Sequence, residues 1–83
     1  MAMKIVSPQA LGTAINDERK KKGLSQENLG KMVGVDQTTV SYIENGKAGV
    51  RLSTILLLLA ALELDLFVQP RTAAQQMPTG DRW

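Results

Sequence analysis

The sequence predicts a mainly α-helical fold: a compact bundle of four or five short helices, with one C-terminal β-strand that pairs across a dimer. Of the 83 residues, 43% are hydrophobic but only 4% are aromatic, so the core must consist of aliphatic side chains, which favours helices. Apolar residues recur at helical spacing in successive segments that begin at Ser or Asp. One domain of this size buries little surface, so a second copy would stabilise it.

The first predicted helix begins at Ser7, because serine caps free amides and Pro8 fits the first helical position. Its residues at helical spacing are Leu11, Ala14, Ile15 and Glu18 or Arg19. The helix ends in the basic run 19–22 before Gly23, where cations face the negative end of the helix dipole and glycine permits a left-handed turn. Such a run is usually a solvated helix end, so by itself it does not establish a nucleic-acid surface.

Two short helices follow, separated by a tight turn at Gly34. Ser25 is predicted to cap the helix over about 26–33, and Asp36 the helix over about 37–44. Helices that cross steeply need a small residue where they touch, and Gly30 supplies it. Their predicted shared core is Leu29, Val33, Val35, Val40 and Ile43.

Burial of these aliphatic side chains turns the opposite side of the 37–44 helix outward. That side carries Gln37, Thr38, Thr39, Ser41 and Tyr42. A neutral polar set of this kind can hydrogen-bond to base edges and touch thymine methyl groups, as a recognition helix does in the major groove. The sequence therefore predicts a DNA-reading face here.

A fourth helix is predicted from Thr54 to about Leu62, capped by Ser53 and apolar on nearly every side. We expect part of its surface to pack inside the subunit and part against a second copy, with a wholly internal helix as the alternative. The predicted dimer contacts, here and in the segment that follows, are Leu56, Leu59, Leu64, Leu66, Phe67 and Val68.

The predicted strand covers 64–69, where apolar and polar residues alternate except at Phe67. A lone strand needs a partner, and the two choices are the same strand of a second subunit or Ile5–Val6. Residues 1–69 are thus expected to form the domain and 70–83 a flexible tail without apolar period. Trp83 is either an ordinary terminal aromatic or an anchor in a pocket of a partner protein.

Composition narrows the function further. Cysteine and histidine are both absent, which removes disulfides, the usual zinc ligand sets and the commonest general base. We therefore expect no enzyme, metal or cofactor. The stretch 55–62 is too short to cross a bilayer and the first residues do not form a secretory signal, so a cytoplasmic, nucleoid-associated protein is expected.

Charge is placed unevenly, because the first 51 residues hold eight Lys and Arg against five Asp and Glu, whereas the remainder holds two against three. A basic N-terminal part suits a nucleic-acid surface. The expected phosphate contacts by charge are Lys20, Lys21, Lys22, Lys31, Lys47 and Arg51.

The stretch 11–62 resembles the Cro/repressor-type (XRE) helix-turn-helix domain, which has the lambda-repressor-like fold. The marks of this resemblance are the motifs 23–26 (GLSQ) with Leu29, 34–35 (GV) and 40–46 (VSYIENG). More narrowly, the motif 4–8 (KIVSP), the leucine-rich helix, the 64–69 segment and the polar tail are similar to HipB-type antitoxins.

The resemblance implies roles for individual residues. Gln37 would read a base edge, most simply adenine, and Gln26 would brace it while facing the phosphate backbone. The full base-reading set is Gln37, Thr38, Ser41 and Tyr42, and the backbone set is Gln26, Thr39, Asn45, Lys47, Lys31 and Arg51. Asp36 departs from the pattern, since a carboxylate there repels phosphate unless it is occupied as a cap.

The resemblance also implies a function: a repressor and antitoxin that dimerises on a palindromic operator, represses its own operon and binds a HipA-like serine/threonine kinase toxin. The alternatives are a stand-alone phage-type or metabolic repressor without a toxin, and a dimeric interaction module that does not bind DNA.

Overall fold

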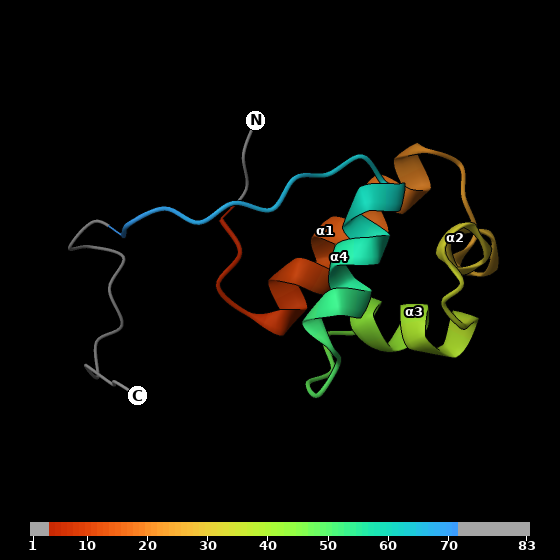
Figure 1. The fold of residues 1–83 in the computed structure, drawn as a ribbon, viewed down its shortest axis with the longest axis horizontal. Helices are drawn as coiled ribbons and strands as arrows, with labels where there is room; N and C mark the ends of the chain where they lie inside the picture. The colour runs from red at the N-terminus through yellow and green to blue at the C-terminus, as the bar shows by residue number, and fades with distance from the viewer. Residues whose placement is uncertain (1–3, 72–83) are drawn as a thin grey trace.

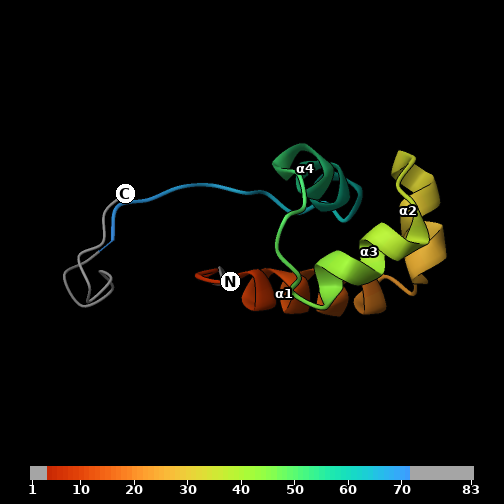
Figure 2. The ribbon, with the colours of Figure 1, turned by 90° about the horizontal axis from the view of Figure 1, so that it is seen from below.

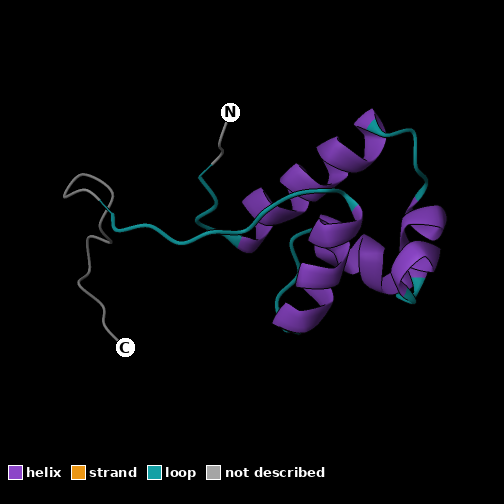
Figure 3. Ribbon diagram, turned by 45° about the horizontal axis from the view of Figure 1, so that its top comes forward, coloured by secondary structure: helices purple, strands orange, loops and turns teal. Residues whose placement is uncertain are grey.

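Four helices make up the computed structural model, which describes residues 4–71 (Figure 1). In chain order they are α1 (Pro8–Lys21), α2 (Gln26–Val33), α3 (Gln37–Glu44) and α4 (Leu52–Ala61). The helices occupy most of the described chain, and no strand is assigned between residues 4 and 71 (Figure 3). The predicted mainly α-helical bundle is confirmed.

Two of the predicted helix starts are closed by the expected serines. The Ser7 hydroxyl accepts a hydrogen bond from the Ala10 amide at 3.0 Å, and Pro8 opens α1. The Ser25 hydroxyl likewise accepts from the Asn28 amide at 2.9 Å. Each serine satisfies one amide that the first helical turn leaves without a partner.

The other two starts differ from the prediction. Asp36 stands at the N-cap position of α3, but its side chain makes no capping hydrogen bond. α4 begins at Leu52 with Arg51 at the N-cap, so Ser53 lies inside the helix and not before it. The first turn of α4 closes on the Arg51 carbonyl, which accepts from the amides of Thr54 and Ile55 at 3.1 and 3.2 Å. The start of α4 is therefore formed by a backbone carbonyl without a side-chain cap.

The core draws on all four helices. Its buried residues are Ile15, Leu29, Val40, Ile43, Leu58, Leu59 and Leu62, with Val33 and Val35 half-buried against them. α3 packs on both α1 and α2, and α2 also contacts α4. Seen from below, α4 lies over the layer that α1 and α3 form (Figure 2). The predicted core of the two short helices is therefore in place.

α4 divides its leucines between the core and the surface. Leu58 and Leu59 are buried, whereas Leu56 is 43% and Leu57 46% exposed. Leu59 was predicted at the dimer interface, and this is corrected: it is 5% exposed and belongs to the core of the single chain. The outward leucines of α4 are Leu52, Leu56 and Leu57.

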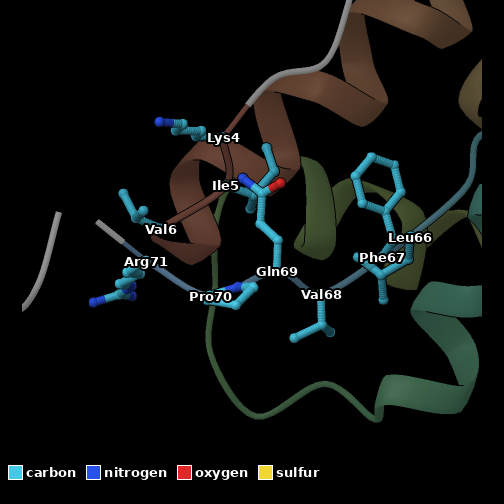
Figure 4. Close-up of a pocket in the computed structure, with 9 residues that line it drawn as sticks. All are labelled: Lys4, Ile5, Val6, Leu66, Phe67, Val68, Gln69, Pro70 and Arg71. Carbon is cyan, nitrogen blue, oxygen red and sulfur yellow. The ribbon is translucent and has the colours of Figure 1, made fainter. Parts of the chain in front are cut away.

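The segment 64–69, expected as a strand, is irregular in the single chain. It leaves α4 through Glu63, which has a left-handed φ of 60°, and passes beside the N-terminal residues 4–6 (Figure 4). Both stretches line one hollow of about 390 Å³, yet no backbone hydrogen bond joins them. Ile5–Val6 is thus not a strand partner here, and pairing with a second subunit stays a prediction.

Two further predictions concern the ends of the chain. Trp83 and residues 72–82 lie outside the described residues, so the boundary between domain and tail at 69/70 stays a prediction. Among the helices of the described chain, none combines the length and apolarity that crossing a membrane requires.

Candidate nucleic-acid interface

α3 has an aliphatic inner side and a polar outer side. Val40 and Ile43 are buried, whereas Gln37 and Thr38 are exposed. Tyr42 is 49% exposed. Thr39 and Ser41 are half-buried at the edges of this outer side. The outer side of α3 therefore presents hydrogen-bonding side chains, and those at its N-terminal end are exposed to a binding partner.

Glycine allows the helices to approach closely enough to fix α3. A Cβ atom on Gly30 of α2 would collide with the carbonyl oxygen of Val35, in the turn that leads into α3. Gly34 ends α2 with a left-handed φ of 73°, as predicted. Sequence reasoning missed Gly12, where a Cβ atom would lie 2.5 Å from the Ile43 carbonyl oxygen and 2.6 Å from that of Glu44. α1 therefore lies directly on the end of α3.

A buried ion pair joins α1 to the C-terminal end of α3. The Arg19 Nε atom lies 2.7 Å from one carboxylate oxygen of Glu44, and an Arg19 Nη atom donates to the other at 3.0 Å. Arg19 also donates to the Leu24 carbonyl at 2.8 Å. We expected Arg19 to be part of a solvated basic run, and this is wrong: it is 8% exposed. It lies one helical turn after the buried Ile15, a signal that could have identified it.

The Glu44 carboxylate collects donors from two further residues. Asn16 of α1 donates to its Oε1 atom at 2.8 Å, and Gln26 of α2 at 3.1 Å. Burial raises the pKa of Glu44, but the hydrogen bonds from Arg19, Asn16 and Gln26 outweigh it and leave the pKa below its ordinary value. The carboxylate is thus charged and fully partnered at neutral pH.

Gln26 hydrogen-bonds to Glu44 and not to Gln37, the partner that the family resemblance implies. It opens α2, as expected, and is half-buried. Its amide nitrogen donates to Glu44, and no hydrogen bond to Gln37 is present between residues 4 and 71. Gln26 is therefore braced by the end of α3 and does not itself brace Gln37.

Ser41 and Asn45, predicted for different roles, contact each other. The Asn45 side-chain nitrogen donates to the Ser41 carbonyl at 2.9 Å and to its hydroxyl oxygen at 3.3 Å. The Ser41 hydroxyl therefore acts as an acceptor here and keeps its own proton for a further acceptor.

Four predicted residues meet around one hollow of about 350 Å³ between α3 and the loop before α4. They are Thr38, Thr39, Tyr42 and Arg51, and the hollow is completed by Gly49, Val50 and Thr54. It combines hydroxyl groups with one guanidinium group, a chemistry that suits a phosphate or sugar edge.

Some of the basic residues form ion pairs with acidic side chains and others do not. Lys22 lies 3.5 Å from Glu18 and 3.4 Å from Glu63, and Lys21 lies 3.8 Å from Glu18. Lys31 pairs with Glu27 at 3.5 Å on the exposed side of α2. By contrast, Lys47 and Arg51 are exposed and form no ion pair within residues 4–71.

Comparison with protein families and curated proteins gives consistent results. A helix-turn-helix family model matches residues 15–68. The antitoxin HipB of Escherichia coli O6:H1 (strain CFT073) is 34% identical over 79 residues, covering 88% of this chain and 84% of that protein. The ImmF control region 10 kDa protein of Bacillus phage phi105 is 36% identical over 70 residues, covering 84% and 78%.

Solved structures with a similar fold include chains that belong to larger complexes. One chain of a HipA-HipB-O2-O3 complex superposes with a TM-score of 0.79 at 32% identity, over 86% of this chain and all of that one. The restriction-modification controller protein C.AhdI from Aeromonas hydrophila reaches 0.65 at 36% identity, over 70% of this chain and 88% of that one.

Proposed function

We propose that this chain, which belongs to the helix-turn-helix family and is similar to HipB-type antitoxins, is a sequence-specific DNA-binding repressor and the antitoxin of a HipBA-type module. One observation carries the DNA-binding part: Val40 and Ile43 bury one side of α3, which leaves Gln37, Thr38 and Tyr42 facing outward. Solved structures of similar chains include a HipA-HipB-O2-O3 complex and a HipB-O4 20mer complex, which supports the same interpretation.

In the proposed complex, α3 of each subunit lies in a major groove of a palindromic operator, about 34–36 Å from its counterpart or a multiple of that distance. The base-reading residues are Gln37, Thr38, Ser41 and Tyr42. Gln37 pairs with adenine through its side-chain amide, and the Ser41 hydroxyl donates the proton that its contact with Asn45 leaves available.

Phosphate contacts supply most of the affinity and the salt dependence. The backbone set is Gln26, Thr39, Asn45, Lys47, Lys31 and Arg51. Lys47 and Arg51 need break no ion pair of the described chain to take part, whereas Lys31 first has to leave Glu27. We therefore assign Lys47 and Arg51 the largest contributions.

The homodimer forms through exposed apolar side chains on α4 and the segment after it. Leu56, Leu66, Phe67 and Val68 are exposed in the single chain, and Leu64 is half-buried beside them. Extended pairing of 64–69 with its copy satisfies backbone groups that the single chain leaves open. As the resemblance implies, the dimer binds a HipA-type serine/threonine kinase, and Trp83 is the proposed anchor.

A second function is favoured by two of the similar proteins. The phage phi105 control-region protein and the restriction-modification controller protein are both named for regulation, and neither name refers to a toxin. The second candidate is therefore a stand-alone repressor with the same DNA-binding face and no kinase partner.

A mobility-shift titration and a pull-down test the two parts separately. We expect the purified chain to shift the DNA upstream of its own gene at concentrations at which a scrambled duplex of equal length stays free. The tagged protein should retain the product of an adjacent kinase-like gene. Binding of the upstream DNA without any kinase partner would favour the stand-alone repressor, and failure to shift any duplex at low salt would exclude both.

A further inference from the structure

Glu44 stands where electrostatics disfavour a carboxylate. It is the last residue of α3, and the C-terminal end of a helix carries partial negative charge. Its side chain is nevertheless only 3% exposed and is held by donors on α1 and α2. Well-packed apolar groups often stabilise a core at least as well as a buried ion pair, so stability alone does not explain this choice.

The same carboxylate fixes the relative positions of three helices. Arg19 and Asn16 bring α1 to Glu44, and Gln26 brings the first turn of α2. Gly12 places the backbone of α1 against the carbonyl oxygens of Ile43 and Glu44. These contacts therefore fix the positions of the end of α3 and of the start of α2 relative to the same part of α1.

That point lies directly next to the proposed DNA-contacting residues. Gln26 is itself in the backbone set, and Asn45 and Lys47 follow Glu44 in the chain. A shift of the carboxylate would move the Gln26 amide and the exit of the chain from α3 together. Contacts of this kind depend on placement to within a fraction of an ångström.

We propose that Glu44 is a positioning residue of the DNA interface: without touching DNA, it orients Gln26 and the C-terminal end of α3 through its contacts with Arg19 and Asn16. This rests on the proposed function. Glu44 adds nothing to phosphate binding as a charge, since a carboxylate repels phosphate, and its effect on affinity comes only from geometry.

The proposal is tested by two variants that each remove one negative charge, because it predicts weaker DNA binding for one variant and unchanged or tighter binding for the other. Glu44→Gln and Asp17→Asn each remove one negative charge, but Asp17 is exposed on α1 and makes no ion pair in the described part of the chain. Affinity for the duplex upstream of the gene is measured by fluorescence anisotropy at a temperature where circular dichroism shows each variant folded. We expect Glu44→Gln to weaken binding by about tenfold or more. Asp17→Asn should bind as tightly as the original chain or more tightly.

A folded Glu44→Gln variant that binds as tightly as Asp17→Asn would overturn the proposal. An original chain that binds no duplex would instead refute the proposed function, so the two failures are distinct.

A double-mutant cycle keeps the proposal testable if Glu44→Gln does not fold. Asn16→Ala removes one donor to Glu44, and Gln26→Met removes another while keeping the side chain's length. We expect Asn16→Ala to weaken operator binding about threefold in the original chain and to have no effect in the Gln26→Met background. The same loss in both backgrounds, or none in either, would contradict coupling through Glu44.

Discussion

At the scale of single residues, the DNA-binding proposal depends on which side chains are left free by the fold. Gln37 is exposed at the first position of α3 and its side chain makes no hydrogen bond within residues 4–71, so both its side-chain oxygen and its side-chain nitrogen are available. Lys47 is exposed and likewise without an ion pair in that range. These two residues have different proposed tasks, one in reading bases and one in neutralising phosphate.

Replacement of Gln37 by alanine should reduce discrimination and leave nonspecific affinity nearly unchanged. Loss of a bidentate contact to adenine costs about 1–3 kcal/mol at one base position. The loss of discrimination is measured from the affinities of the original chain and of Gln37→Ala for a set of operator duplexes that each carry one base change. A variant with the original sequence preference at every position would contradict the role assigned to Gln37.

Replacement of Lys47 by alanine should weaken binding to all sequences alike. One lost phosphate contact lowers the slope of log affinity against log salt by about 0.9. Titrations of the original chain and of Lys47→Ala at several salt concentrations measure the slope. Equal slopes for Lys47→Ala and the original chain would show that Lys47 does not neutralise a phosphate.

At the scale of helices, close backbone contacts and one buried carboxylate hold α3 in place. Gly30 allows α2 to lie against the turn before α3, and Gly12 allows α1 to lie against its end. Glu44 connects the same three helices through hydrogen bonds. Substitutions at these positions should therefore lower the free energy of unfolding and shift the position of α3 at the same time.

Gly30→Ala should lower the free energy of unfolding by about 1–3 kcal/mol, because the added methyl group meets backbone that cannot move independently. Alanine is otherwise the better helix former, so the sign reports the clash. Urea unfolding measures the change, with Thr13→Ala on the exposed side of α1 as the control. A stabilised Gly30→Ala variant would mean that α2 does not approach the turn this closely.

The pKa of Glu44 gives the fold a specific dependence on pH. Because the folded state lowers this pKa below its ordinary value of 4.5, the contribution of Glu44 is complete above that value and is lost as the pH falls through the lower folded pKa. The difference in unfolding free energy between the original chain and Glu44→Gln should therefore narrow as the pH falls from 7 to 3. Urea unfolding at both pH values measures it, and a constant or widening difference would contradict the ion pair.

The elements also show what the sequence could and could not predict. Ser7, Ser25 and Gly34 are local signals, and they gave the first two helices and the turn correctly. The start of α4 was misplaced because no side-chain cap marks it, so the serine signal at Ser53 was misleading. The Arg19–Glu44 pair was missed because helical spacing can show that Arg19 faces inward but cannot identify its partner, which lies 25 positions away in the chain.

The same contrast holds within the candidate site. The outward side of α3 follows from helical periodicity, so Gln37, Thr38 and Tyr42 could be identified from the sequence. The partner of Gln26 is a long-range contact that periodicity does not contain. Likewise, only the folded chain shows that Leu59 is buried while Leu56 and Leu57 are not.

At the scale of the whole molecule, the single chain leaves an apolar surface that a second copy would cover. It consists of Leu56, Leu57, Leu66, Phe67 and Val68, all exposed. Dimerisation would also place two α3 helices on one duplex, as a palindromic operator requires.

Phe67→Ser should shift the protein from dimer toward monomer, because an aromatic ring that is 66% exposed in the single chain loses its apolar contact with the second copy. Sedimentation equilibrium measures the dissociation constant, which we expect to rise at least about tenfold. Gln69→Ser in the same segment is the control. A monomeric original chain, or equal constants for both variants, would remove this segment from the interface.

The central claim, that the outward side of α3 meets DNA, is tested most directly by nuclear magnetic resonance of the isotope-labelled chain titrated with the duplex upstream of its gene. We expect the largest shift changes at the backbone and side chains of Gln37, Thr38, Ser41 and Tyr42, with smaller ones at Gln26 and Lys47, and none with a scrambled duplex at the same salt concentration. Changes confined to α4 and residues 64–71, or no changes with either duplex, would contradict the account.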